Sequence, residues 1–185
     1  MIIYNFSLKS YLYPIQGNYE ILCSLFLKEE TEVTMKSIEE AIQQSSSFRN
    51  PYHKATVNLI YSGRWIINLH NELFNEYGLT IQQYNVLRIL KGQYPKAITV
   101  KQIQHRMLDK ASDASRVVEG LRKKGFVQRK LNSEDRRRVD VMITQKGSQL
   151  LNSIENRSGE MDRFLSNLSM EEVKFLNNLL DKIRS

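Results

Sequence analysis

The chain has 185 residues, of which 27 are Lys or Arg and 20 are Asp or Glu, so its formal net charge is +7. A hydrophobic fraction of 41% is enough for a globular core, and no apolar run reaches the roughly 18 residues of a membrane-spanning helix. The single cysteine, Cys23, excludes an internal disulfide framework and is typical of the reducing cytosol. We therefore expect a cytoplasmic protein of one domain, or of one domain with an appendage.

Residues 1–34 are rich in Tyr, Phe, Ile and Leu and lack the basic start and cleavage site of a signal peptide. Two interpretations stay open. The segment is an appendage that packs on the core or on a partner subunit, or it is an in-frame translation upstream of a true start at Met35. Cys23 lies within it with Lys28 as the closest basic residue, a setting that gives little support to a redox-sensing thiol.

Two helices and one long apolar surface are predicted in residues 35–78. A short helix covers residues 37–44, and Asn50-Pro51 is a strong start signal for a second helix that runs to Tyr77 and ends at Gly78. The second helix is apolar on more than one side. Because one side can pack on its own lobe, the other side indicates association with a second subunit.

The supporting helix of the next lobe, residues 79–147, begins at a capping box formed by Thr80 and Gln83. Another capping box, Thr99 with Gln102, starts a helix that ends near Met107. Apolar residues at helical spacing and then at alternating spacing follow. They predict a second helix at about 111–124, strands at 126–131 and 139–143, and a polar turn at 132–138. Helix, turn, helix and a two-stranded ribbon make a winged helix-turn-helix.

Charge is concentrated in the same stretch. Residues 99–147 contain thirteen Lys or Arg and six Asp or Glu, for a net charge of +7, so the rest of the chain is neutral. A basic surplus that follows a helix-turn-helix and a hairpin points to a polyanion as partner. A merely solvated basic face would explain the charge but not its coincidence with these elements.

Two further helices are predicted after the wing, in residues 148–185. The first is long, from Thr144 to about Leu165, with a bend at Ser158-Gly159. The second begins at the capping box of Ser169 and Glu172. The fold class is thus mainly α with a small β-wing: a winged helix-turn-helix flanked by N- and C-terminal helices suited to dimerisation. A monomeric helix bundle is the alternative, because it would show similar apolar stripes.

From about Asn50 to the C-terminus the chain resembles the MarR family of bacterial transcriptional regulators. An Asp-x-Arg motif, Asp135 to Arg137, precedes the aliphatic-Thr pair Ile143-Thr144 at the family's spacing. Other matching segments are SRVVE (115–119), LRKKG (121–125) and Lys146-Gly147. Gly120 departs from the family pattern, and it marks either a close backbone approach or a weak spot in the helix.

The resemblance implies a homodimeric repressor that reads a near-palindromic DNA operator. The second helix of the motif would lie in the major groove and the wing in the minor groove. Arg137 would enter the minor groove, oriented by Asp135, and Glu119 is a further candidate at the base edges. The predicted DNA-binding residues are Lys101, Ser112, Asp113, Ser115, Arg116, Lys123, Lys124, Arg129, Asp135, Arg136, Arg137 and Arg138, together with Lys130 at the phosphates. Asp113 has an alternative role, stabilisation of the helix N-terminus.

The resemblance also implies regulation by a small aromatic or phenolic effector between the dimer helices and the DNA-binding lobe. Candidate pocket residues are Tyr52, Tyr61, Trp65 and Tyr84, although aromatic residues at helical spacing are more often core. No catalytic pairing, cofactor motif or cysteine cluster is evident, so we expect neither an enzyme nor a cofactor, and no metal site. Alternative functions are a winged helix that binds other proteins and a general nucleic-acid binder without an operator.

Overall fold

A computed structural model describes residues 36–131 and 139–185 of the protein. The chain divides into two units, residues 1–48 and 49–185. In the described part of the first unit, α2 (Ile38–Ala41) begins at a capping box between Ser37 and Glu40. It is shorter than the predicted helix over 37–44, because the backbone leaves helical geometry and Gln43 adopts a φ of 52°.

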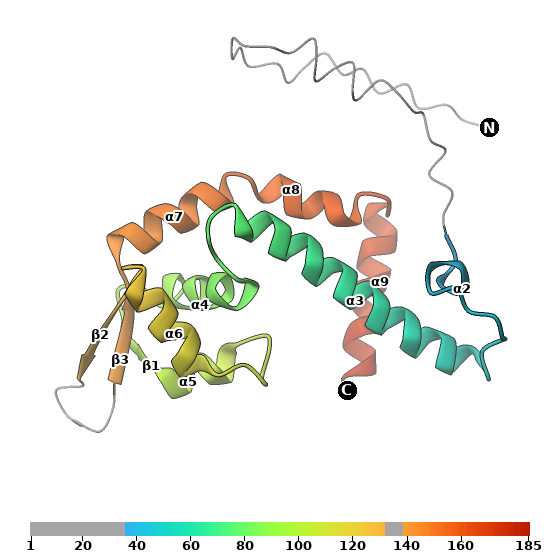
Figure 1. Ribbon diagram of the computed structural model, residues 1–185, viewed down its shortest axis with the longest axis horizontal. Coiled ribbons are helices and arrows are strands. Elements are labelled where there is room, and N and C mark those ends of the chain that lie inside the picture. The colour runs from blue at the N-terminus through green and yellow to red at the C-terminus, as the bar shows by residue number, and fades with distance from the viewer. Residues whose placement is uncertain (1–35, 132–138) are drawn as a thin grey trace, which may run out of the picture. The chain divides into compact units, whose positions relative to one another are not determined.

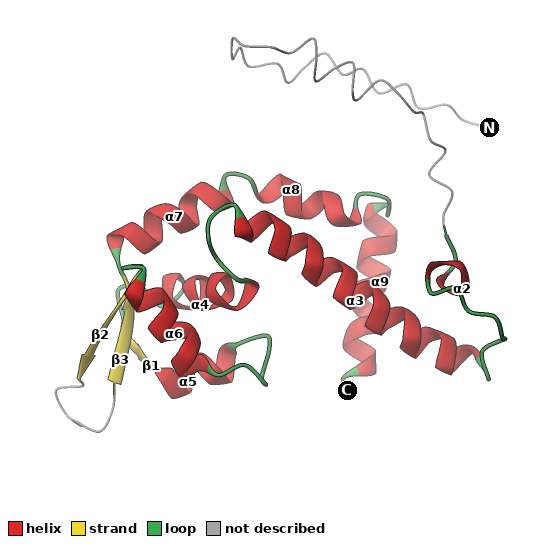
Figure 2. Cartoon of the chain, viewed as in Figure 1, coloured by secondary structure: helices red, strands yellow, loops and turns green. Residues whose placement is uncertain are grey.

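The second unit begins with the long helix α3 (Pro51–Asn75), shown with the other elements in Figures 1 and 2. Its start confirms the sequence signal: Pro51 is the first helical residue, and the side chain of Asn50 accepts a hydrogen bond of 2.9 Å from the backbone N–H of His53. The helix ends three residues before Gly78, whose φ of 63° turns the chain towards the next helix, α4 (Ile81–Lys91).

The remaining elements form the winged helix-turn-helix and the C-terminal helices. The lobe contains α4 (Ile81–Lys91), β1 (Ile98–Thr99), α5 (Val100–Arg106), α6 (Ala114–Lys123), β2 (Val127–Leu131) and β3 (Val139–Ile143). After it come α7 (Gln145–Glu155), α8 (Ser158–Asp162), the 3-10 turn η1 (Arg163–Leu165) and α9 (Met170–Ile183). The capping boxes predicted at Thr80, Thr99 and Ser169 are all formed.

The sheet is antiparallel with strand order β1-β3-β2. The wing hairpin pairs Val127 with Ile143 at its base and Leu131 with Val139 at its outer end. The third strand was missed by the sequence prediction: β1 pairs Ile98 with Val141. Two residues are too few to show the alternation by which a strand is recognised in sequence.

One hydrophobic core holds this lobe together. It draws on the end of α3, on α4, α5, α6, α7 and on the inner face of the sheet. Its most buried large side chains are Phe74, Leu79, Leu87, Leu90, Ile103, Met107, Leu121, Leu151 and Ile154. Within α3 only Leu73 and Phe74 are buried, and α9 has no buried residue. Several large apolar side chains on the rest of these two helices, among them Trp65 and Phe175, are therefore exposed in the part of the chain that the structure describes.

The single long helix predicted over 144–165 is wrong. Instead α7 ends at Glu155 and α8 starts at Ser158, so the break precedes the expected bend at Ser158-Gly159. Arg157 lies in the break with non-helical φ and ψ of −104° and 16°. Its guanidinium donates to both carboxylate oxygens of Glu160, at 2.6 and 2.8 Å, and to Glu76 just after α3, at 2.6 Å. These contacts hold the interrupted segment against the end of α3.

No helix within residues 36–131 or 139–185 is both long and apolar enough to cross a membrane.

Candidate nucleic-acid interface

The turn between α5 and α6 is fixed by one side chain, Gln104. Its amide nitrogen donates to the backbone carbonyls of Lys110 and Ser112, each at 3.0 Å. Its amide oxygen accepts from the backbone N–H of Ala114 at 3.0 Å. Gln104 thus joins the first helix of the motif to the start of the second. Sequence reasoning missed this role, because an interior glutamine is common in any helix and only the folded turn brings its three partners within reach.

Asp109 closes the same turn. Its carboxylate accepts from the backbone N–H of Ala111 at 3.0 Å and from the Ser112 hydroxyl at 2.6 Å. The hydrogen bond from Ser112 is the main reason that the pKa of Asp109 lies below its usual value. The hydroxyl of Ser112, a predicted DNA contact, is therefore engaged within the turn of this structure.

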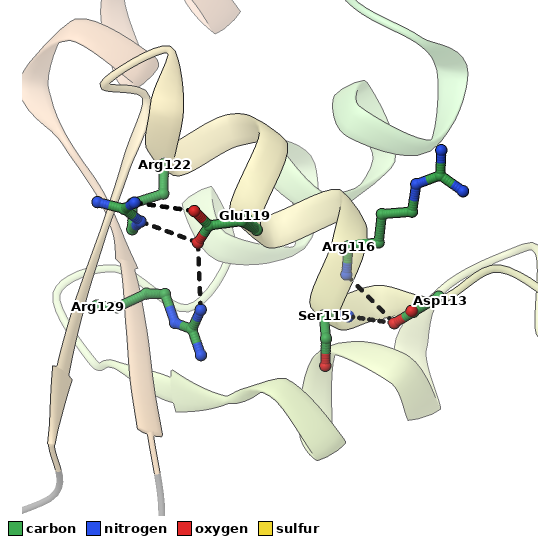
Figure 3. A network of polar contacts seen from close by, with 6 residues as sticks. All are labelled: Asp113, Ser115, Arg116, Glu119, Arg122 and Arg129. Atoms are coloured by element: carbon green, nitrogen blue, oxygen red, sulfur yellow. Dashed lines mark hydrogen bonds and ion pairs between the residues drawn. The ribbon is translucent and has the colours of Figure 1, made fainter.

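Asp113 is the N-cap of α6 (Figure 3). Its Oδ1 accepts from the backbone N–H groups of Ser115 and Arg116, at 2.9 and 3.2 Å. The recognition helix therefore begins at Ala114 rather than near residue 111, and residues 111–112 belong to the turn. The alternative role predicted for Asp113, stabilisation of the helix N-terminus, is confirmed by this geometry.

The two sides of α6 differ sharply. Ala114, Val118 and Leu121 are buried, with 2% exposure or less. Ser115, Arg116 and Lys123 are exposed. In Figure 3 the guanidinium of Arg116 extends away from the other labelled side chains of the helix, and only the backbone N–H of Arg116 joins the contacts drawn there. A polar, basic face on a helix anchored from behind is the arrangement that the major groove accepts.

A second group of side chains joins α6 to the wing. The carboxylate of Glu119 accepts two hydrogen bonds from Arg122, at 2.9 and 2.8 Å, and one of 3.3 Å from Nη1 of Arg129 on β2 (Figure 3). The bidentate bond from Arg122 is the main cause that lowers the pKa of Glu119 to about 2. Arg129, predicted to contact phosphates, is thus paired within the protein.

Lys124 also has its charge engaged internally. Its ammonium donates to the carbonyl of Gly78 at 2.6 Å and to Oε1 of Gln83 at 2.9 Å. The same glutamine also lies close to Gly120: a Cβ at that position would stand 2.9 Å from Nε2 of Gln83. Because this neighbour is the end of a side chain, the predicted close approach of backbone at Gly120 is not observed. Lys124, predicted to contact phosphates, is thus bonded within the protein.

The base of the wing is locked to the end of α6. The Thr144 hydroxyl donates to the carbonyl of Gly125 at 2.8 Å and accepts from the backbone N–H of Gly147 at 3.1 Å. The first turn of α7 approaches Phe126 so closely that a Cβ on Gly147 would stand 2.2 Å from the Phe126 carbonyl oxygen. Gly125, with φ of 77°, makes the turn into β2.

For the remaining predicted DNA contacts that the structure describes, only exposure to solvent bears on the prediction. Lys101 is exposed on α5, and Lys130 is exposed on β2. The turn 132–138 lies outside the described residues, so Asp135, Arg136, Arg137 and Arg138 stay predictions, as does the role of Cys23.

A cavity of about 460 Å³ lies between α3, α4 and the turn that follows α5. Its lining residues are Ile66, Ile67, His70, Phe74, Ile81, Gln82, Tyr84, Asn85, Met107, Leu108 and Asp109. Of the four predicted pocket residues only Tyr84 lines it, stacked on Phe74 with ring centroids 4.2 Å apart. Tyr52, Tyr61 and Trp65 are exposed along α3 and are not brought together with Tyr84.

Among residues 36–131 and 139–185, no group of three or more His, Cys, Asp or Glu side chains could hold a metal ion. Nδ1 of His70 lies 2.8 Å from the carbonyl oxygen of Ile66, and the His70 ring packs edge-on against Phe164.

Comparison with known proteins agrees with this geometry. Residues 79–139 match the family model described as MarR family. The chain is 34% identical over 121 residues to the HTH-type transcriptional regulator MhqR of Bacillus subtilis (strain 168), a match that covers 63% of this chain and 81% of that protein.

Solved structures show the same fold. A mutant MarR from E. coli complexed with operator DNA has a TM-score of 0.65 and 23% identity, with 75% of this chain and 99% of that chain covered. BpsR of Bordetella bronchiseptica, in a structure that concerns regulation of its DNA binding by 6-hydroxynicotinic acid, has a TM-score of 0.62 and 20% identity, with 71% and 99% covered. The matched proteins are regulators rather than enzymes. This chain belongs to the MarR family and is a winged-helix, DNA-binding transcriptional regulator.

Proposed function

We propose that this regulator binds a near-palindromic operator as a homodimer and represses transcription there. The observation that carries the proposal is the exposed face of α6, where Ser115 and Arg116 project from a helix anchored through Val118 and Leu121. A helix mounted in this way can enter the major groove, and two such helices read half-sites roughly 34–36 Å apart. Occupation of a promoter by the dimer excludes the polymerase.

Each exposed group has a matching chemistry on DNA. The planar guanidinium of Arg116 can donate two hydrogen bonds to guanine O6 and N7, and the hydroxyl of Ser115 can serve a base edge or a phosphate. Lys101, Lys123 and Lys130 supply sequence-independent phosphate contacts. At the wing, Arg137 enters the minor groove with Asp135 orienting it, and Arg136 and Arg138 follow the phosphates. The fold shared with an operator-bound MarR supports this assignment.

The test is a fluorescence-anisotropy titration with DNA from the region upstream of the gene for this protein and with a scrambled duplex, at several salt concentrations. We expect binding to the cognate duplex to be tighter by a factor of about a thousand or more. Arg116→Ala and Arg137→Ala should each reduce this ratio. Arg163→Ala is the matched control, because it removes the same charge from exposed η1, outside the lobe.

Two outcomes would contradict the proposal. Equal and steeply salt-dependent binding to both duplexes leaves only the phosphate contribution and indicates a general nucleic-acid binder. No binding at low salt would favour a winged helix that recognises other proteins. Repression is tested separately: a reporter under the same upstream region should fall in activity when the regulator is expressed, and a rise would indicate an activator.

The second subunit of the proposed dimer is a second copy of this chain. Exposed apolar side chains on α3 include Leu59, Ile60, Tyr61, Trp65 and Ile67, and those on α9 include Met170, Phe175, Leu179 and Ile183. Contiguous patches of large apolar side chains are rarely left exposed to water in a soluble protein. A self-complementary interface formed from these two helices would cover the apolar side chains of both.

We also propose that the cavity beside Tyr84 binds a small uncharged aromatic effector, such as a phenol. Apolar side chains dominate its lining, and its described lining residues include Asp109 but no Lys or Arg to pair with a carboxylate. Leu108 and Asp109 belong both to this lining and to the turn before α6. An occupant that displaces them would shift the start of the recognition helix and weaken operator binding.

Thermal-shift and Trp65 fluorescence titrations with neutral phenols and with phenolic acids test the effector. We expect neutral compounds to bind and to release the operator, and Ile81→Phe, which fills the cavity, to abolish the response while DNA binding persists. A flat response to both classes, or a preference for the acids, would contradict the proposed effector.

A further inference from the structure

The basic surface formed by α6 and β2 contains one acid, Glu119, placed between two arginines. Arg122 lies one turn further along α6 and grips the carboxylate with Nε and Nη2, at 2.9 and 2.8 Å. Arg129 reaches the same carboxylate from β2 with Nη1, at 3.3 Å (Figure 3). The side chains of Glu119, Arg122 and Arg129 are 34%, 49% and 32% exposed, so the cluster lies at the surface rather than in the core.

Both arginines direct N–H donors at Glu119 that would otherwise be open to a phosphate: Arg122 uses two of its five donors and Arg129 uses one. Arg122 uses its planar fork in a bidentate bond, the strongest arrangement available between a guanidinium and an oxyanion. Arg129 is oriented along the surface towards α6 by the same acceptor. The three groups together carry a single positive charge, where two free arginines would carry two.

Arg116 on the same helix provides the contrast. Its guanidinium points away from the cluster in Figure 3 and makes no ion pair with any described residue. On α6, Arg116 is therefore available to a ligand, whereas Arg122 is bonded to Glu119. Arg129, on β2 of the wing, is bonded to the same carboxylate.

We propose that Glu119 is a positioning residue that determines specificity by withholding Arg122 and Arg129 from the DNA backbone. The inference rests on the proposed function, because it assumes that this face of α6 meets DNA. Phosphate contacts carry no sequence information and supply nearly all of non-specific binding. An acid that occupies two arginines therefore lowers affinity for non-cognate DNA and leaves the reading by Arg116 intact.

Keeping Arg122 and Arg129 from the phosphates should change the affinities for cognate and non-cognate DNA by different amounts. On an operator, base contacts fix the register, so released arginines meet only the phosphates that this register places near them. On other sequences the protein can slide to the position that the arginines favour. Release of the two arginines is thus expected to favour non-cognate DNA more than the operator.

The test is the anisotropy titration of Glu119→Gln on the cognate and scrambled duplexes between about 50 and 200 mM salt. Glutamine keeps the size of the side chain but removes the charge that holds both guanidiniums. We expect binding to scrambled DNA to tighten about tenfold and its salt dependence to steepen by about 0.9 for each additional phosphate contact. The ratio of cognate to scrambled affinity should fall.

Two further variants isolate the mechanism. Arg122→Gln alone should change scrambled binding little, because that arginine is already held, but in the Glu119→Gln background it should remove part of the gain. Glu155→Gln is the matched control: it takes the acid from another arginine pair, Arg88 with Glu155 at 2.6 Å, at the contact of α4 and α7. We expect this control to leave both affinities unchanged.

The outcomes separate the inference from the proposed function. A gain that Arg122→Gln does not diminish would show that Glu119 acts only by repelling phosphates, and would overturn withholding. The inference would also be overturned if Glu119→Gln lost affinity equally for both duplexes and had a lower melting temperature, because Glu119 would then only stabilise the fold. Specific wild-type binding with an unaltered Glu119→Gln profile overturns the inference alone. Absence of wild-type binding even at low salt overturns the proposed function together with it.

Discussion

At the scale of single residues, the junction between the end of the recognition helix and the wing requires a glycine at position 147, because a larger residue would not fit there. Gly147 lets the first turn of α7 rest against the backbone of Phe126, and a Cβ there would stand 2.2 Å from a carbonyl oxygen. Backbone atoms cannot move aside as the end of a flexible side chain can. The Thr144 hydroxyl, bonded to Gly125 and Gly147, fixes the same joint by direct contact.

Gly147→Ala should lower the free energy of unfolding by about 1–3 kcal/mol, the usual cost of overpacking. Gly159→Ala in α8 is the matched control, because a Cβ there meets nothing within 4 Å among the described residues, its chain neighbours and own helix backbone aside. There the substitution should be neutral or stabilise by up to about 1 kcal/mol. Urea unfolding of both variants checks the prediction, and equal stabilities would contradict it.

Glu119 provides a prediction about pH. Its pKa is lowered to about 2 in the folded protein, mainly by the hydrogen bonds from Arg122, from an ordinary value of 4.5. A group with a depressed folded pKa contributes stability that is present above its unfolded pKa and lost as the pH falls through the folded pKa. The contribution of Glu119 should therefore be complete near neutrality and decline between about pH 4.5 and 2.

The measurement is a carboxyl NMR titration of Glu119, accompanied by thermal unfolding of wild type and Glu119→Gln across that range of pH. The melting temperatures of the two proteins should converge as the pH falls. A Glu119 titration midpoint near the ordinary glutamate value would contradict the prediction.

At the scale of elements, α6 is positioned by one side chain from the turn before it and one from α5. Asp113 accepts from the N–H groups of Ser115 and Arg116, and Gln104 on α5 bonds to the backbone of Lys110, Ser112 and Ala114. These bonds set where the recognition helix begins and therefore which residues face outward. The hydrophobic pattern alone placed the start three residues too early, because Ala111 and Ser112 are compatible with a helix and only the cap ends the turn.

Asp113→Ala should cost about 1 kcal/mol of stability through loss of the cap. Asp113→Ser keeps an N-cap oxygen and should restore most of that stability. If Asp113 also accepts a hydrogen bond from a cytosine amine, operator affinity will stay low in Asp113→Ser although its stability recovers. Urea unfolding and operator titration of both variants distinguish the two roles, and full stability of Asp113→Ala would contradict the cap.

At the scale of the whole molecule, the DNA-binding lobe has a buried hydrophobic core, whereas the flanking helices α3 and α9 expose many of their apolar side chains. Every described residue of the main core lies between Leu73 and Ile154, whereas α9 and most of α3 keep apolar side chains at the surface. Arg157 bridges the interrupted C-terminal segment to Glu76 and Tyr77 near the end of α3.

Leu179→Glu on α9 should dissociate the proposed dimer, because it places a charge on a face that would be buried against the second copy. Asn178→Glu, one residue earlier and exposed, is the control. Analytical ultracentrifugation should show a monomer for Leu179→Glu and a dimer for Asn178→Glu, with operator affinity lost only in the former. A wild-type monomer, or a Leu179→Glu dimer, would contradict the proposed interface.

Sequence patterns succeeded where the determinants were local. Capping boxes, the Asn50-Pro51 start and the change from helical to alternating periodicity predicted the α-helices and the wing hairpin, since each depends on residues a few positions apart. Patterns failed for β1, which is too short to alternate, and for the helix over 144–165, which is interrupted where Arg157 binds residues at the end of α3. Neither partner strand nor partner helix is visible from those residues alone.

The same division holds for the candidate site. The sequence by itself determined the winged helix-turn-helix, the location of its charge and the outward placement of Ser115 and Arg116, because these follow from periodicity and composition. Only the tertiary structure decided which charges are available: Lys124 is bound to Gly78 and Gln83, and Glu119 holds Arg122 and Arg129, while Arg116 extends free of the cluster. Charges pair across distances in space that residue spacing does not encode, so availability to DNA is a property of the fold.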